Sequence, residues 1–109
     1  MSDIDDVIDS IKDEAVVLIK EQLKDLLLSA AEETDAVIRQ TGEKITYWLL
    51  LRARGELNDS ELEALLYARD QLLRQYKNTL QIEASARVEK IAIALVNIVL
   101  DKLLGLVFH

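Results

Sequence analysis

No proline interrupts this chain of 109 residues, and glycine occurs at only three positions, 42, 55 and 105. Proline ends or kinks helices, and glycine weakens them. The rest of the sequence is rich in Leu, Ala, Glu, Lys, Arg and Gln, which are good helix formers. We therefore expect an all-α fold, and the length suits a single domain over residues 1–109.

The clearest break in the helical pattern is the stretch RGELNDSELEAL. Gly55 suits the end of one helix, and Asn58 or Ser60 can cap the start of the next, with Ser60 and Glu63 in capping-box spacing. These signals predict three segments: a helix over about 3–54, a turn over about 55–59, and a helix over about 60–105.

The first arm has two weak points where a break is an open alternative. In SAAEETD, Ser29 and Thr34 are possible caps, and a glycine at Thr41-Gly42 costs about 1 kcal/mol relative to alanine. We prefer one long helix, kinked or straight, over two shorter ones, which would make three helices in all. After the turn, apolar residues recur at threes and fours with no breaker before Gly105.

Two long helices joined by a short turn predict an antiparallel helical hairpin with arms roughly 75 Å long at about 1.5 Å per residue. In that register, residues 15–28 lie beside residues 86–99. Both segments are unusually apolar. The hairpin therefore brings the two most apolar parts of the chain together near its termini.

The second of these segments has more apolar surface than one neighbouring helix can cover. On a helical wheel, Lys90, Ala94, Asn97, Asp101 and Gly105 form one narrow polar line. Two apolar lines lie beside it: Val88, Ala92, Leu95, Val99, Leu103, and Ile93, Val96, Leu100, Leu104, Val107. One partner helix at about 8–10 Å covers only one of these lines. The surplus face needs a further cover.

A second copy of the chain is the cover that we prefer, because two hairpins would then form a four-helix bundle or a larger coiled-coil assembly. This predicts a homo-oligomer, dimer or higher, whose interface residues are Val16, Leu23, Leu27, Leu95, Val99, Leu103 and Leu106. A membrane span is disfavoured, since Asp101 and Lys102 would each cost about 2.5–3.5 kcal/mol inside it. Peripheral membrane contact through the same apolar end stays open.

The stretch ITYWLLLRARG, before the turn, is a second apolar cluster. Trp48 and Leu51 are candidates for a contact with a protein partner, since tryptophan is favoured at binding hot spots. The competing interpretation places Trp48 in the core, because it falls in register with the apolar stripe of the first arm.

The charge balance of 13 Lys and Arg against 20 Asp and Glu gives a net charge of -7. This charge repels phosphate backbones, so nucleic acid is not an expected partner. Cysteine is absent, and the acidic N-terminus is unlike a basic targeting signal, so we expect a cytoplasmic location. The only histidine is the last residue, His109.

Motifs for catalysis are missing: there is no nucleophile elbow, no phosphate-binding glycine loop and no internal histidine to act as a base. We expect no catalytic residue, no cofactor and no metal site. The sequence predicts a non-enzymatic interaction or scaffold protein that self-associates and presents surfaces to a protein partner, as bacterial or phage accessory and assembly factors do. The alternative is a peripheral membrane or hydrophobic-surface coating protein that uses the apolar end.

Overall fold

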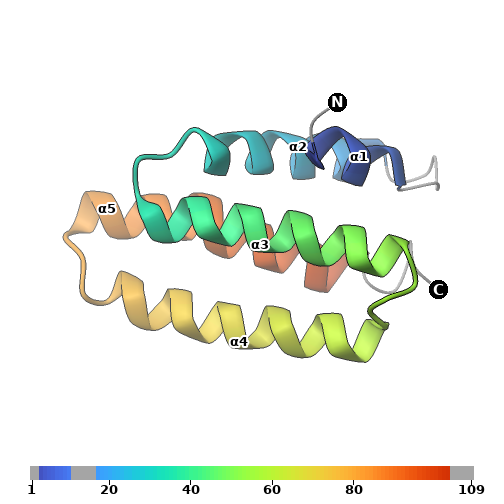
Figure 1. Cartoon of the computed structure of the whole chain (residues 1–109). Helices are drawn as coiled ribbons and strands as arrows, with labels where there is room; N and C mark the ends of the chain where they lie inside the picture. The colour runs from blue at the N-terminus through green and yellow to red at the C-terminus, as the bar shows by residue number, and fades with distance from the viewer. Residues whose placement is uncertain (1–2, 11–16, 104–109) are drawn as a thin grey trace.

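Residues 17–103 make four antiparallel passes, up and down, around a shared apolar core (Figure 1). The computed structural model describes residues 3–10 and 17–103. Its elements are α1 (Asp3–Ser10), α2 (Val17–Ala31), α3 (Ala36–Ala53), α4 (Asp59–Lys77), and a last pass that joins α5 (Ile82–Arg87), η2 (Val88–Ile93), α6 (Ala94–Ile98) and η3 (Val99–Leu103). We call this last pass, residues 82–103, the C-terminal helix. The predicted all-α helical bundle is confirmed, and a single chain forms it.

The predicted hairpin of two long arms is wrong. The molecule measures 39 × 26 × 22 Å along its principal axes, far less than a 75 Å arm requires. The predicted helix over 3–54 comprises three described helices, of which α1 packs against both α2 and α3 instead of continuing in line with them. The predicted helix over 60–105 is broken between α4 and α5.

The break between α2 and α3 lies in the SAAEETD stretch, and Asp35 is the residue that caps the new helix. Its carboxylate Oδ1 accepts hydrogen bonds from the backbone N–H groups of Val37, at 2.9 Å, and Ile38, at 3.1 Å. The Glu33 carboxylate accepts a further bond from the Thr34 N–H at 3.2 Å. These bonds satisfy backbone donors that a helix start leaves free.

The break between α4 and α5 contains neither proline nor glycine. The helix ends after Lys77, and the Thr79 hydroxyl donates to the carbonyl of Tyr76 at 2.7 Å. Gln81 precedes α5 without a side-chain cap. Weak local signals are enough here because folding back places the C-terminal helix against α2, α3 and α4.

The turn predicted over about 55–59 is confirmed. Gly55 adopts a positive φ of 79°, which favours glycine. The capping box joins Asn58 and Glu61, not Ser60 and Glu63: the Asn58 side chain accepts from the Glu61 N–H at 2.8 Å, and the Glu61 carboxylate accepts from the Asn58 N–H at 3.0 Å. Arg52 Nε, across the turn, donates to Asp59 at 2.7 Å.

The C-terminal helix is the centre of the core and supplies nearly half of the buried apolar side chains among the described residues. Both of its predicted apolar lines face inward: Val88, Ala92, Leu95, Val99 and Leu103 from one, and Ile93 and Val96 from the other. α2, α3 and α4 all contact it. The surplus apolar surface is therefore covered within one chain in the described residues.

Gly42 lies inside α3 at a close approach between α2 and α3. A Cβ atom at this position would lie 2.7 Å from the Cβ of Ala30. The small side chain of Ala30 and the missing Cβ of Gly42 thus let the two helices approach, and α3 continues through Thr41-Gly42 without a break. The open alternative of a break at this glycine is wrong.

We expect Gly42→Ala to lower the free energy of unfolding by about 1 kcal/mol. Overpacking against Ala30 costs about 1–3 kcal/mol, which outweighs the roughly 1 kcal/mol gained in helix propensity. In an Ala30→Gly background the overlap is gone, so Gly42→Ala should become stabilising. Urea denaturation of the four proteins measures this sign reversal. Stabilisation by Gly42→Ala in both backgrounds would contradict the close crossing.

We expect Leu95→Ala to lower the free energy of unfolding by about 2–5 kcal/mol, since Leu95 is fully buried. Leu18→Ala is the matched control, because Leu18 is 74% exposed, and should change it by less than about 0.5 kcal/mol. The unfolding midpoint, followed over a hundredfold range of protein concentration, should stay constant. A loss below about 0.5 kcal/mol for Leu95→Ala would contradict its burial, and a midpoint that rises with concentration would show that association of copies contributes to the stability.

Candidate functional site

The predicted oligomer-interface residues lie inside the chain's own core. Leu23, Leu27, Leu95, Val99 and Leu103 are each at most 1% exposed, so a second copy has no access to them in this fold. Val16 and Leu106 lie outside the described residues. A contact between copies, if one forms, must use other side chains.

Trp48 and Leu51, the predicted partner contacts, lie on α3 and are half-buried. Trp48 packs against the core. This favours the interpretation of Trp48 as part of the core, while Leu51 contributes a partly exposed edge beside the turn.

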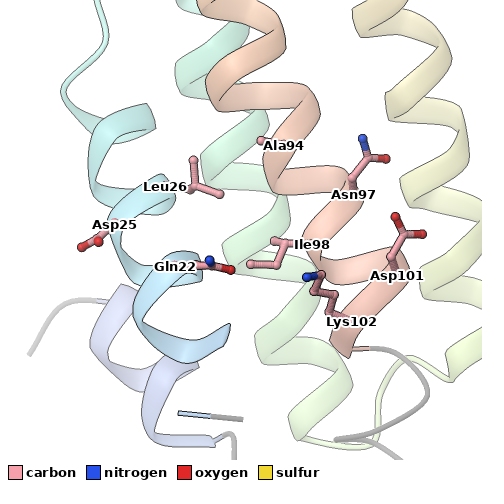
Figure 2. A pocket seen from close by; sticks show the side chains of 8 residues that line it. All are labelled: Gln22, Asp25, Leu26, Ala94, Asn97, Ile98, Asp101 and Lys102. Carbon is pink, nitrogen blue, oxygen red and sulfur yellow. The ribbon is translucent and has the colours of Figure 1, made fainter. Parts of the chain in front are cut away.

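An open groove of about 590 Å³ runs between α2 and the C-terminal helix (Figure 2). This volume falls within the range of about 300–1,000 Å³ that is usual for ligand sites. The lining residues are Gln22, Asp25 and Leu26 from α2, and Ala94, Asn97, Ile98, Asp101 and Lys102 from the C-terminal helix. We call it the α2 groove.

Apolar side chains form the floor of the α2 groove. Polar side chains lie along its two edges, one on α2 and one on the C-terminal helix, which we call its banks. Figure 2 shows the side chains of Leu26 and Ile98 pointing into the groove from opposite sides, with Gln22 and Lys102 toward one end. Asp25 points outward from α2, and Asp101 points away from α2 on the side nearer α4 (Figure 2). Each bank therefore carries one carboxylate.

The small side chain of Ala94 helps to make this surface hollow. Ala94 belongs to the polar line predicted along the C-terminal helix, and Lys90 and Asp101 on the same line are exposed. The segment that contains Ala94 is also flanked by two π-helical stretches, η2 and η3. Such stretches inside α-helices are frequent at functional sites.

The polar side chains of the groove make no hydrogen bond or ion pair with another described residue. They are Gln22, Asp25, Asn97, Asp101 and Lys102. On the other side of α2, by contrast, Lys24 lies 3.7 Å from Asp5 of α1. The charged groups of the groove are thus free to meet groups from outside the described part of the chain.

A second cavity, of about 260 Å³, lies among α1, α2 and α3, and Ile4, Leu27 and Leu50 contribute its apolar walls. The hydroxyl of Thr46, which also lines it, is already used, since it donates to the Gly42 carbonyl at 2.8 Å. This cavity is smaller than the usual ligand site. The α2 groove is the better candidate.

The described residues contain no group of three or more His, Cys, Asp and Glu side chains placed to hold a metal ion. None of their helices has the length and hydropathy needed to cross a membrane.

The turn before α3 also gathers charged groups, and its contacts are structural. The hydroxyl of Tyr76 on α4 donates to Asp35 Oδ2 at 2.8 Å. Arg87 of the C-terminal helix lies 3.4 Å from Glu33. Arg39 donates to the Glu33 carbonyl at 3.2 Å. One turn thereby ties three passes of the bundle together at one end.

The hydrogen bond to Asp35 raises the pKa of Tyr76 above its ordinary value, and burial and the charge of Asp35 act in the same direction. The neutral phenol is the donor in this bond. Its stabilising contribution is therefore complete below about pH 10, the ordinary tyrosine pKa, and is lost as pH rises through the raised pKa of the folded state.

The sequence predicts the residues on one side of the α2 groove, but it does not indicate that the surface between the two helices is concave. The predicted polar line includes Ala94, Asn97 and Asp101, which line the groove on the side of the C-terminal helix. The hairpin register placed residues 15–28 beside residues 86–99, and α2 does contact η2 and α6. The register did not indicate which side chains of α2 would border a hollow. The sequence signal for the groove is Ala94, a small residue in the polar line that lies close to apolar Ile98.

We expect Tyr76→Phe to remove the part of the alkaline loss of stability that Tyr76 causes. Urea denaturation at pH 8 and at about pH 10.5 should show a smaller decrease for Tyr76→Phe than for the parent chain. Tyr67→Phe is the control, because Tyr67 is 55% exposed, and it should leave the decrease unchanged. Equal decreases for the parent chain and Tyr76→Phe would contradict the bond to Asp35.

Comparison of the chain with protein-family models, curated proteins and solved structures finds no match.

Proposed function

We propose that this chain is a non-enzymatic interaction protein that docks a helical segment of a protein partner in the α2 groove. The observation that carries the proposal is the groove itself: an apolar floor of Leu26, Ala94 and Ile98 between two helices, bordered by polar side chains that have no partner among the described residues. Grooves of this form are a recurrent way of binding an amphipathic helix.

The size of the groove fits such a segment. Its residues on the C-terminal helix run from Ala94 to Lys102, a rise of about 12 Å at about 1.5 Å per residue. A docked helix would thus contact the groove over two to three turns. A helix placed there would lie at about 8–10 Å from its neighbours, as packed helices do. The docked segment would extend the bundle by one further helix.

The earlier alternative, a peripheral membrane protein, has lost its main support. It depended on the apolar end of the chain, but Leu95, Val99 and Leu103 are buried under α2, α3 and α4. The exposed large apolar side chains of the described residues are spread over several helices, and include Leu18, Tyr47 and Ile82. A protein partner is therefore the occupant that we favour.

Self-association remains a separate prediction, and sedimentation of the purified chain tests it. Self-association was predicted as the cover for surplus apolar surface on the C-terminal segment, and in the described residues that surface is covered within one chain. We keep the interpretation of an accessory or assembly factor, of the kind found in bacteria and phages, as the biological setting. A cytoplasmic location is in keeping with the absence of cysteine.

Site-specific photo-cross-linking in the expressing cells tests the docking function. A benzoylphenylalanine in place of Gln22 samples the groove, and one in place of Gln40, exposed on α3, is the control. We expect a protein adduct from the groove position that the control position does not form. Mass spectrometry of the adduct should then identify the cross-linked segment, whose sequence should have the apolar spacing of an amphipathic helix.

The purified partner should bind the parent chain and lose about tenfold or more in affinity with Ala94→Gln, which fills the groove with a good helix former. Ala68→Gln, at an exposed position of α4, is the matched control and should leave the Kd unchanged. Gln22→Trp blocks the groove from α2 without touching the core. A partner that binds both groove variants as tightly as the parent chain would contradict the proposal.

A further inference from the structure

The two banks of the α2 groove carry a charge pattern that selects the occupant. Asp25 and Asp101 are both exposed, and each lies on the outer side of its own helix (Figure 2). Neither forms a hydrogen bond or ion pair with another described residue. The groove is thus an apolar trough between two free carboxylates.

Several other acidic side chains of the bundle are paired. Asp59 pairs with Arg52, Asp70 with Arg74, and Glu89 with Lys77. Arg74 Nε donates to Asp70 Oδ2 at 2.9 Å, and this bond raises the pKa of Arg74. The carboxylates of the groove contrast with these, and the chain as a whole carries a net charge of -7. Both the local and the overall charge favour a cationic ligand.

A docked helix would present its apolar stripe to Leu26, Ala94 and Ile98 and its flanks to the two banks. Residues on the flanks of an apolar stripe lie about 100° to either side, so they point outward along the banks. Lysine and arginine have long apolar stems that cover the floor while their charged heads reach the water. Such heads on the two flanks would meet Asp25 and Asp101.

Lys102 does not oppose this arrangement, because it lies toward one end of the groove with Gln22 (Figure 2). It would face the end of a docked helix instead of its flanks. The carbonyl groups at a helix C-terminus carry negative partial charge and accept hydrogen bonds from lysine. The ammonium group of Lys102, the one cation among the lining residues, can therefore donate hydrogen bonds to backbone carbonyl groups of the docked helix.

We propose that the α2 groove takes a cationic amphipathic helix of another protein, with lysine or arginine on both flanks of its apolar stripe. This inference rests on the proposed docking function and specifies the chemistry of the partner.

Three designed peptides of about 14 residues test the charge preference. All have the same leucine stripe at helical spacing, and their flanking positions are all lysine, all glutamine or all glutamate. Fluorescence anisotropy of labelled peptides, with the full chain at about 0.1 M salt, measures each Kd. We expect the lysine peptide to bind about tenfold or more tightly than the glutamate peptide, with the glutamine peptide between them.

Two double variants separate local charge from overall charge. Asp25→Asn/Asp101→Asn should weaken binding of the lysine peptide about threefold to tenfold, since exposed ion pairs are individually modest. Asp9→Asn/Glu63→Gln changes the net charge equally at exposed positions outside the groove, and should change the Kd less than twofold. Equal weakening by both double variants would overturn the assignment of the two groove carboxylates.

The remaining outcomes distinguish the chemistry from the docking function. Binding that is independent of peptide charge but is lost in Ala94→Gln would overturn the cationic partner and leave the docking function standing. Binding that Ala94→Gln leaves unchanged, or no binding by any of the three peptides, would overturn the inference. Self-association that Ala94→Gln abolishes would identify a second copy as the occupant, against our proposal.

Discussion

Burial of the C-terminal helix is the constraint on which the rest of the structure depends. Its two apolar lines, which include Leu95 and Val96, need cover on more than one side, and leaving them in water would forgo roughly 25 cal/mol for each Å² of apolar surface. A single antiparallel neighbour cannot provide this cover. α2, α3 and α4 together cover the C-terminal helix. They can all lie against it because the chain reverses direction after each pass.

The turns are therefore as important as the helices. Asp35 caps α3 and accepts the Tyr76 hydroxyl, so one side chain both starts a helix and holds α4. The close crossing of Ala30 and Gly42 sets the distance between α2 and α3. These contacts place α2 beside the C-terminal helix. The α2 groove is the part of that seam where the small side chain of Ala94 leaves the space open.

Several local features were predictable because they depend on residues close in sequence. The all-α class follows from composition, the turn at Gly55 from helix-ending signals, and the bond between Asp70 and Arg74 from their spacing. Spacing alone does not settle every partner: Arg87 has helical spacing to Glu83, but it lies beside Glu33 on another pass of the bundle. The candidate site was only half predictable, since the polar line is local and its neighbour on α2 is not.

The sequence by itself determined that the chain is helical, where its clearest turn lies, and that its C-terminal segment is too apolar for one neighbour. Only the tertiary structure decided that the cover comes from the same chain and that the helices break after Ala31 and Lys77. The physical reason is that the break after Lys77 has no strong local signal, while the cap at Asp35 marks only one of two candidate breaks in the first arm. The free energy gained by burying both apolar lines selects these two positions. The α2 groove exists for the same reason, because a hollow between two helices is a property of their packing and not of either sequence alone.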